Sequence, residues 1–288
     1  MEINSLEICR LVEVALREYL NACPDTQSTQ AARYTVLAGG QRWRAQTTIA
    51  AGLALDLDAV RTCMPMACAI ELVHAATLVL DDRPSMDNST TRRGKPCLHL
   101  VYPEWVVDMA PVFLVNLAYC IVMGNPHVSA ERKVDVVGML GSAGADICRG
   151  QEMDLSHPPT SLDQLIECHR LKTGVLFAAS MRSAGLLGGG NSSQIQALGD
   201  CGMNMGIAFQ LQDDIADFNS DVPTDPGHRA NPYNAARQSG VDNILSLAQE
   251  YSARSLRAIE GFGPSANLLR SIVGRATQTS TVVQPGSV

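Results

Sequence analysis

Two short segments carry acidic side chains in spacings that could bind metal. The first, "LVLDDRPSMDNSTTRRGKP" at residues 78–96, places Asp81, Asp82 and Asp87 after an apolar run and two arginines and a lysine behind them. By itself such a segment could be a solvated turn. Because Pro84 disfavours continued helix, we expect Asp87 to return from a loop toward the other two aspartates.

The second segment is "FQLQDDIADFNSD", at residues 209–221. Asp213 and Asp217 are four residues apart, so on a helix they lie within about 40° of each other and repel unless a cation separates them. The alternative is a helix end whose acids face water. The apolar residues before Asp213 instead favour acids at the mouth of an internal space.

Converging carboxylates without lysine partners are the ligands that Mg²⁺ prefers, and Mg²⁺ completes its shell with water and substrate phosphate. Two such clusters could hold Mg²⁺ ions around one diphosphate. The remaining positive charge would come from four basic residues: Arg92, Arg93, Lys95 and Lys172. The apolar run before Asp81 would then line a pocket for a hydrophobic substrate.

Composition excludes several other classes of protein. The 288 residues carry a net charge of −7, which argues against nucleic-acid binding. The nine cysteines form no C-x-x-C pair, which predicts reduced thiols and a cytoplasmic location. No signal peptide or transmembrane segment is expected. The nearest candidate, residues 109–126, contains Pro111, Asn116 and Gly124 and is interpreted as a buried helix.

Apolar residues recur at helical spacing from end to end, with Asn4-x-x-Glu7 suited to a capping box. We therefore expect an all-α fold, a single-domain helical bundle around a deep central cavity, over residues 1–275. Residues 276–288 are predicted to be a disordered tail. After the first helix, the predicted helices are 29–38, 44–56, 60–82, 104–123, 129–155, 161–187, 192–219, 231–239 and 240–260.

These motifs make the sequence resemble the trans-isoprenyl diphosphate synthases, specifically the geranylgeranyl diphosphate synthase branch. "DDRPSMD" is similar to the longer form of the family's first aspartate-rich motif, and "RRGKP", "GQEMDL" (150–155), "KTG" (172–174) and "FQLQDDIAD" (209–217) follow in family order. The likeness spans about residues 30–235. It implies the isoprenoid synthase fold, usually a homodimer, and Mg²⁺-dependent joining of isopentenyl diphosphate to an allylic diphosphate.

The resemblance also implies roles for individual residues. The metal ligands would be Asp81, Asp82, Asp87, Asp213, Asp214 and Asp217. The allylic diphosphate, whether dimethylallyl, geranyl or farnesyl, would face Arg92, Lys172, Thr173 and Gln210. Among these, the residues taking direct part in catalysis would be Asp81, Asp82, Asp213 and Lys172.

The second substrate, isopentenyl diphosphate, would contact Gln41, Arg44, His74 and Arg93. A histidine on an apolar helix is more often a core residue, but His74 lies seven residues before Asp81, where the family has a ligand. Ala76 and Thr77 lie one helical turn below the metal site, where an aromatic residue in the family tends to stop growth at fifteen carbons. The small Ala76 therefore predicts a twenty-carbon product, unless it is small only for helix packing.

The sequence departs from the family at two places. In "LAGGQRWRA" (37–45), Gln41 replaces a lysine that binds isopentenyl diphosphate, and Ala45 replaces a usual proline. No lysine follows Lys172, where the family normally has one after the second acidic motif; Arg229, or His228 if protonated, could substitute.

These losses leave two alternatives. One is a synthase-like terpene cyclase that ionises an allylic diphosphate without isopentenyl diphosphate, although it would have no use for Arg44, His74 and Arg93. The other is a non-catalytic subunit that regulates a partner synthase, which would have no need of two intact acidic clusters.

Overall fold

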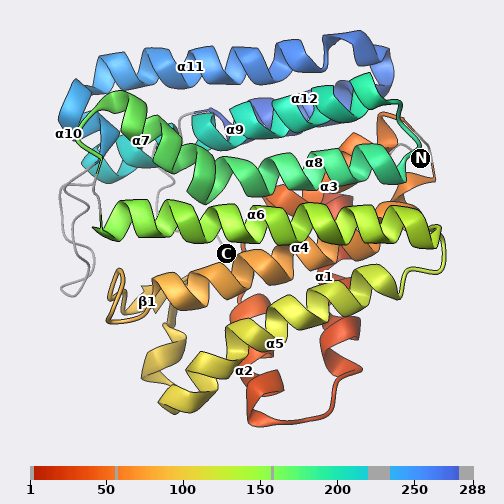
Figure 1. The fold of residues 1–288 in the computed structure, drawn as a ribbon, viewed down its shortest axis with the longest axis vertical. Coiled ribbons are helices and arrows are strands. Elements are labelled where there is room, and N and C mark those ends of the chain that lie inside the picture. The colour runs from red at the N-terminus through yellow and green to blue at the C-terminus, as the bar shows by residue number, and fades with distance from the viewer. Residues whose placement is uncertain (1–2, 56–57, 157–158, 220–233, 279–288) are drawn as a thin grey trace.

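The computed structural model describes residues 3–55, 58–156, 159–219 and 234–278, and over these ranges the chain is an assembly of α-helices (Figure 1). This confirms the predicted all-α class. The α-helices are α1 Ser5–Asn21, α2 Gln27–Val36, α3 Trp43–Leu53, α4 Ala59–Asp81, α5 Glu104–Met123, α6 Ala130–Ser156, α7 Leu162–His169, α8 Val175–Leu187, α9 Ser192–Asn219, α10 Ala235–Ser239, α11 Val241–Ala258 and α12 Asn267–Ala276.

Short elements of other kinds connect the helices. Two-residue strands, β1 (Thr91–Arg92) and β2 (Lys95–Pro96), form an antiparallel hairpin after α4. A π-helical segment, η2 (Arg170–Gly174), joins α7 to α8, and two 3₁₀ segments are η1 (Leu98–Leu100) and η3 (Glu260–Ala266). The hairpin and η2 both contain predicted site residues.

The core is built around α4, which packs against α3, α5 and α8. Its residues Ala67, Cys68, Ala69 and Ile70 are consecutive and fully buried, as expected of a helix that is apolar on every side. Figure 1 shows α8, α6, α4 and α5 as long, roughly parallel helices, with α11 along one edge of the molecule. The acidic segment that follows α4 therefore begins at the end of a core helix.

Glycines set how closely the helices near the site approach. A Cβ on Gly150 of α6 would lie 2.8 Å from Leu171 Cβ and 2.9 Å from the backbone nitrogen of Lys172. A Cβ on Gly206 of α9 would lie 2.7 Å from the Cα of Gly174. Larger residues at these two positions would push α6 and α9 away from η2, which lies between them.

Most of the predicted helices match the observed ones to within a few residues. The single helix expected over 161–187 is divided by η2, and residues 231–233 of the expected helix 231–239 lie outside the described ranges. Helix α12 was missed, although Leu269, Ile272, Val273 and Ala276 follow helical spacing and are buried. At α1, Asn4 accepts from the backbone of Glu7, but the Glu7 carboxylate binds Arg10 and does not complete the capping box.

None of the nine cysteines forms a disulfide. Helices α4 and α5 are long and apolar enough to cross a membrane by length and composition, but the most apolar window of α4 is 72% buried inside the protein. The corresponding window of α5 is only 44% buried. The large apolar side chains exposed on α5 and α6 include Trp105, Met109, Val112, Met123 and Val134.

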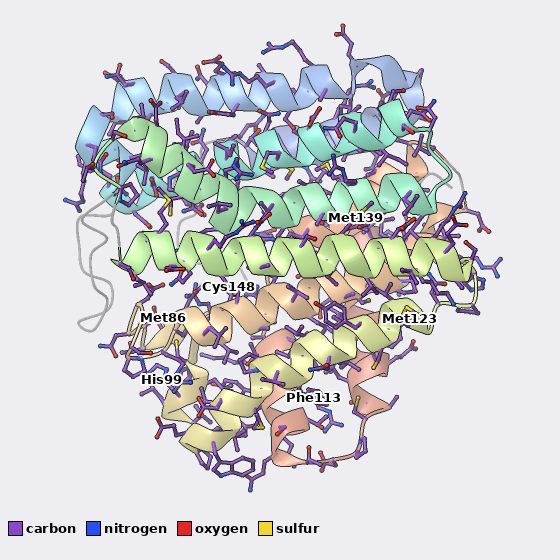
Figure 2. All side chains as sticks on the ribbon, viewed as in Figure 1. Met86, His99, Phe113, Met123, Met139 and Cys148 are labelled. Atoms are coloured by element: carbon purple, nitrogen blue, oxygen red, sulfur yellow. The ribbon has the colours of Figure 1, made fainter. Side chains whose placement is uncertain are left out.

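We refer to these five side chains as the α5–α6 apolar face. In Figure 2, the labelled side chains of Phe113 and Met123 on α5 lie on the same side of the molecule as those of Met139 and Cys148 on α6. Exposed large apolar side chains that gather on one face of a protein usually mark a place where another protein packs.

Candidate active site

The first acidic cluster is built at the C-terminus of α4. Asp81 is the last residue of the helix and Asp82 caps it. The chain turns back so that the backbone N–H of Asp87 donates to the carbonyl oxygen of Asp81 at 2.9 Å. Asn88 has a φ of 53°, which completes the reversal. Asp87 therefore returns from a loop to the helix end, as its position after Pro84 predicted.

The β1–β2 hairpin brings arginines to this cluster. Arg92 donates to Asp82 from Nε at 3.1 Å and from Nη2 at 2.5 Å, so the Asp82 carboxylate is neutralised within the protein. Arg93 and Gly94 form the two-residue turn and both have positive φ, 55° and 73°. A left-handed arginine is strained, and such strain is common at functional sites.

The second acidic cluster lies in the last two turns of α9. Asp213 is half-buried and Asp217 is exposed, whereas Asp214 is only 4% exposed. The Asp214 Oδ2 lies 3.0 Å from His169 Nε2 and accepts from the backbone N–H of Ala235 at 2.9 Å. Asp214 is therefore tied to α7 and α10. Sequence reasoning missed His169, because no spacing along the chain connects it to α9.

Between the two clusters lies η2, which carries Lys172 and Thr173. Lys172 Nζ donates to Asp154 Oδ2 at 2.5 Å, and Thr173 Oγ1 donates to Gln210 Oε1 at 3.0 Å. Burial alone would lower the pKa of Lys172, but the carboxylates of Asp154 and Asp81 outweigh it and raise the pKa. Lys172 is thus a charged ammonium group near Asp81, with Asp154 as a partner that was not among the predicted site residues.

Two aspartates carry raised pKa values. Burial, together with Asp87 and Asp82, raises the pKa of Asp81 to about 6, even though Lys172 and Arg92 act to lower it. Burial, followed by Asp217 and Asp214, raises the pKa of Asp213 to about 7. Burial is the largest cause in both cases and neighbouring carboxylates add to it, so a bound cation would stabilise the ionised form of each aspartate.

The arrangement fits a divalent metal by its chemistry. Over the described residues, no three His, Cys, Asp or Glu side chains converge into a preformed metal site. The donors are nevertheless carboxylate oxygens, which suit Mg²⁺, an ion that takes few protein ligands and fills its shell with water and phosphate. Asp81 and Asp213 are the best-suited donors, since each is half-buried and has a raised pKa.

A cationic region lies beside the acidic clusters. The Arg44 guanidinium lies 4.5 Å from the ring centroid of Phe177, and its Nε is buried without a hydrogen-bond partner. Burial lowers the pKa of Arg44 to about 10. Burial and the neighbouring Arg44 and Arg93 hold the pKa of His74 well below its usual value, so His74 is a neutral imidazole.

The tip of the hairpin completes this region. A Cβ on Gly40 would lie 2.8 Å from the Arg93 Cζ, so Arg93 rests directly on the Gly39–Gly40 segment. Burial and the charge of Arg42 lower the pKa of Arg93. Neither Arg93 nor Arg44 has a carboxylate partner among the residues described here. Two half-buried cations without acidic partners are suited to binding an anion. Lys95 instead lies over the Tyr34 ring, at 5.4 Å.

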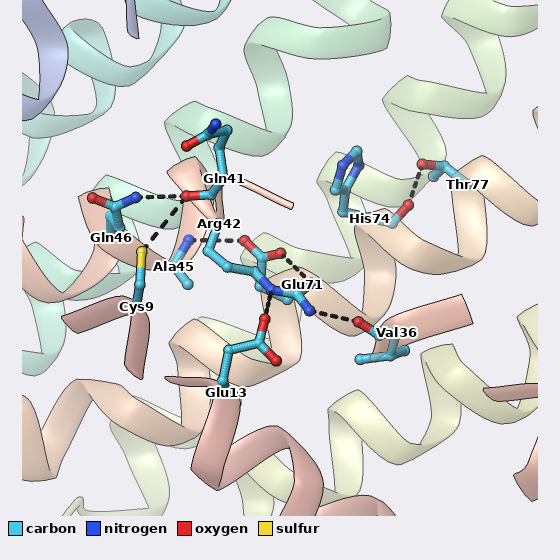
Figure 3. Close-up of polar contacts among 10 residues, drawn as sticks. All are labelled: Cys9, Glu13, Val36, Gln41, Arg42, Ala45, Gln46, Glu71, His74 and Thr77. Atoms are coloured by element: carbon cyan, nitrogen blue, oxygen red, sulfur yellow. Dashed lines mark hydrogen bonds and ion pairs between the residues drawn. The ribbon is translucent and has the colours of Figure 1, made fainter. Parts of the chain in front are cut away.

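Arg42 has a different role from its neighbours (Figure 3). It is 4% exposed and donates to Glu13 at 2.7 Å, to Glu71 at 3.2 Å and to the carbonyl oxygen of Val36 at 2.5 Å. The other Glu71 oxygen accepts from the backbone N–H of Ala45 and so caps α3. Sequence reasoning missed this network, although a lone glutamate in "AIELVHAATLVL" signals a buried partner.

Gln41 lines a pocket of about 150 Å³ that is separate from the Arg42 network. Its carbonyl oxygen accepts from Gln46 and Cys9, which leaves its side chain outside the network (Figure 3). The pocket is lined by Gln41, Trp43, Phe209, Gln212, Asp213, Ala216, Arg275, Ala276 and Gln278.

The two residues expected to set product length lie on α4 below the first cluster. Ala76 is 2% exposed, and Thr77 is half-buried with its hydroxyl donating to the carbonyl oxygen of His74 at 2.9 Å. Arg229 and His228, considered as substitutes for a missing lysine, lie outside the described residues.

The model of the polyprenyl synthetase family matches residues 25–228, which include both acidic clusters. The chain belongs to the polyprenyl synthetase family. This membership accounts for the order of the motifs along the sequence.

Relatives of this polyprenyl synthetase family member include synthases of two kinds. It is 34% identical to geranylgeranyl pyrophosphate synthase 10, mitochondrial, from Arabidopsis thaliana over 71% of this chain, and spans 60% of that protein's length. It is 32% identical to farnesyl diphosphate synthase from Geobacillus stearothermophilus over 72% of each chain.

A solved structure of geranyltransferase from Legionella pneumophila superposes with a TM-score of 0.84 at 26% identity, covering 95% of this chain and 94% of that one. The chain therefore has the isoprenoid synthase fold as well as the family's sequence motifs.

Proposed function

We propose that this family member is a Mg²⁺-dependent prenyltransferase that condenses isopentenyl diphosphate with an allylic diphosphate. The observation that carries the proposal is the pairing of two regions of opposite charge. Burial, with neighbouring carboxylates, raises the pKa values of Asp81 and Asp213. Arg44 and Arg93 are half-buried cations with no carboxylate partner among the described residues. A reaction that joins two diphosphates, one of them bound through metal, needs both regions.

The acidic region would bind the allylic diphosphate through Mg²⁺. Asp81 and Asp213 would be the principal ligands, supported by Asp87 and Asp217. Asp82 and Asp214, each already bound to a protein group, would hold the clusters in shape. Lys172 and Arg92 would contact the diphosphate as cations. Thr173 would act together with Gln210, to which its hydroxyl is bonded.

The cationic region would bind the isopentenyl diphosphate. Arg44 would use its unpartnered Nε, Arg93 would contribute a second guanidinium from the hairpin tip, and the neutral His74 would donate a hydrogen bond. Gln41 could donate from its amide but brings no charge. The same residues weigh against a terpene cyclase, which has no second diphosphate to bind.

The chemistry requires separation of charge in a site without water. Bound Mg²⁺ would stabilise the allylic diphosphate as it leaves. Lys172 and Arg92 would add to that stabilisation as the C–O bond breaks. Apolar residues that precede Asp81 on α4 would keep water from the allylic cation. The double bond of isopentenyl diphosphate then attacks the cation to form the new C–C bond, and the proton lost passes to the departed diphosphate.

We further propose geranylgeranyl diphosphate, with twenty carbons, as the product. The relatives include enzymes named for both twenty-carbon and fifteen-carbon products, so length depends on the floor of the pocket. Ala76 is buried and presents only a methyl group one turn below Asp81, which leaves room for a longer chain.

Replacing Ala76 with tyrosine should shorten the main product from twenty to fifteen carbons. The ring would fill the space that the growing chain needs, while turnover with short primers should continue. Chromatography of the dephosphorylated products measures the change. Thr77→Ser is the control because it keeps the hydroxyl bonded to His74 and adds no bulk. An unchanged product from Ala76→Tyr would place the floor elsewhere.

The central experiment is incubation with Mg²⁺, isopentenyl diphosphate and, separately, dimethylallyl, geranyl or farnesyl diphosphate. A twenty-carbon alcohol seen only after phosphatase treatment would support the synthase. A hydrocarbon or terpene alcohol formed without isopentenyl diphosphate would instead indicate a cyclase. No product with any primer, but stimulation of an added synthase, would indicate a regulatory subunit.

We also propose that the protein is a homodimer joined through the α5–α6 apolar face. Trp105, Val112 and Val134 are more than half exposed, which is costly for a face left in water. Val112→Asp should convert the dimer to monomer in light scattering, whereas Val14→Asp, at an exposed position on α1, should not. A monomeric wild-type protein would contradict the proposal. The cytoplasmic location stays a prediction.

A further inference from the structure

We propose that Arg275 of α12 supplies the positive charge that Gln41 lacks in the binding of isopentenyl diphosphate. The inference rests on the proposed function, because it adds one residue to that substrate's site. Nothing in the sequence motifs points to Arg275, which lies beyond the region matched by the family model.

The pocket of about 150 Å³ brings Arg275 and Gln41 together. Gln41 lies just before α3, Asp213 comes from α9 and Arg275 comes from α12, so three distant segments share one wall. Phe209, one turn before Asp213 on α9, joins the same pocket, and its ring centroid lies 5.9 Å from that of Phe177. The Phe177 ring also makes a cation–π contact with the Arg44 guanidinium, so the pocket adjoins the cationic region.

Arg275 is available to a ligand. Its guanidinium lies 5.6 Å from the centroid of the Trp43 ring, a cation–π contact that directs it toward the start of α3. No acidic partner for it is found in the described parts of the chain, and the residue is exposed. Because Trp43 immediately precedes Arg44 in the chain, the Arg275 guanidinium that stacks on Trp43 is held near Arg44.

The end of α12 is anchored at this position. The carbonyl oxygen of Thr277 accepts from Gln212 Nε2 at 3.4 Å, and the Thr277 hydroxyl pairs with Ser252 at 2.6 Å. Gln212 Oε1 is buried in the pocket wall without a hydrogen-bond partner. Polar groups of α9 therefore face this pocket as well as the C-terminal end of α12.

Charge explains why a cation is needed here. Asp213 lies on the pocket wall and would repel a diphosphate, and the amide of Gln41 offers only a dipole against that repulsion. A guanidinium at position 275 places positive charge beside the diphosphate and screens it from Asp213. Gln41 has no side-chain hydrogen bond within the described structure, so its amide can turn to the same ligand.

Two measurements test the interaction with isopentenyl diphosphate. One is its KM in turnover, and the other is its Kd for the full-length protein, measured by calorimetry without an allylic primer. Arg275→Gln should raise both the KM and the Kd for isopentenyl diphosphate roughly tenfold or more, as loss of a charge-assisted contact predicts. The KM for the allylic substrate should change less than about twofold. Arg275→Lys should keep most of the affinity.

Gln41→Lys in the Arg275→Gln background should restore binding, because it returns a positive charge to the same pocket from the other side. Arg257→Gln, at an exposed position on α11, is the matched control and should have no effect. Unchanged affinity of Arg275→Gln for isopentenyl diphosphate overturns the inference. An equal change in the KM of both substrates also overturns it, and so does a loss of affinity that Gln41→Lys does not reverse.

Failure of the proposed function gives a different result. If the wild-type protein binds isopentenyl diphosphate in calorimetry and Arg275→Gln weakens that binding, the role of Arg275 stands even if no condensation is detected. If the wild-type protein does not bind isopentenyl diphosphate, both the proposed function and the inference are overturned.

Discussion

The two acidic clusters place similar side chains in very different surroundings. The first is assembled from a helix end, a reversing loop and a hairpin, and Asp82 is neutralised by Arg92, whose side chain is 38% exposed. The second stays on α9, and Asp214 is held by a histidine that is 7% exposed. In both clusters the second aspartate of the pair is bound to the protein, and the first has a raised pKa.

The two adjacent aspartates of each cluster are therefore expected to have different roles. Asp81 and Asp213 are expected to bind metal, whereas Asp82 and Asp214 are expected to maintain structure. The second cluster is also expected to depend more on buried contacts than the first.

The largest effect should follow from removing a first aspartate. Asp81→Ala and Asp213→Ala should each lower kcat by on the order of 10²–10³, because each removes a metal ligand that stabilises the departing diphosphate. Far-UV circular dichroism should show that both variants remain folded. Near-normal turnover in either variant would contradict the metal-binding role of that residue.

The second aspartates should differ in their effect on folding. Asp214→Asn should lower the free energy of unfolding by about 2–4 kcal/mol, because it weakens a buried, hydrogen-bonded pair with His169. Asp82→Asn should cost only about 1 kcal/mol, since its partner Arg92 is partly solvated. Urea denaturation measures both.

Asp135→Asn, an exposed position on α6, is the control and should stay within about 0.5 kcal/mol of the wild type. If Asp82→Asn and Asp214→Asn lowered the free energy of unfolding equally, the proposed difference between a partly solvated and a buried hydrogen-bonded pair would be contradicted.

The smallest effect should appear in the pH dependence of stability without metal. The folded protein holds Asp81 and Asp213 with pKa values of about 6 and about 7, above the ordinary value of 3.8. The folded state therefore binds more protons than the unfolded state, and stability should fall as pH rises from about 4 to about 7. Asp213→Asn should raise the Tm in EDTA at pH 8 by a few degrees, and not at pH 4.

Mg²⁺ with inorganic diphosphate should raise the Tm of the wild type at pH 8 much more than that of Asp213→Asn. If Asp213→Asn lowered the Tm at pH 8 without metal, its carboxylate would be stabilising, and the repulsion inferred from its surroundings would be absent.

The helices were predictable because their signals are local. The apolar run ending at Leu80, the continuous pattern of 192–219 and the turn after Pro84 depend on neighbours within a few residues. The π-helical η2 was not predictable, since it depends on how Gly150 and Gly206 let α6 and α9 press on this segment. Helix α12 had a sufficient apolar pattern and was overlooked.

The residues of the candidate site also fall into those that the sequence predicted and those that it could not predict. Residue type and spacing located the two acidic clusters, the arginines behind the first, and Lys172 with Thr173. His169, Glu71 and Asp154 could not be assigned, because each acts through a partner far away in the sequence.

By itself the sequence determined the helical class, the end of α4 at an acidic segment and the family to which the chain belongs, because helical periodicity and motif order are written along the chain. Only the tertiary structure decided which aspartate of each pair is bound to protein and which has a raised pKa. It also placed Arg275 and Gln41 on the wall of one pocket. These outcomes depend on burial and on charges from distant segments, and both exist only once the helices have packed.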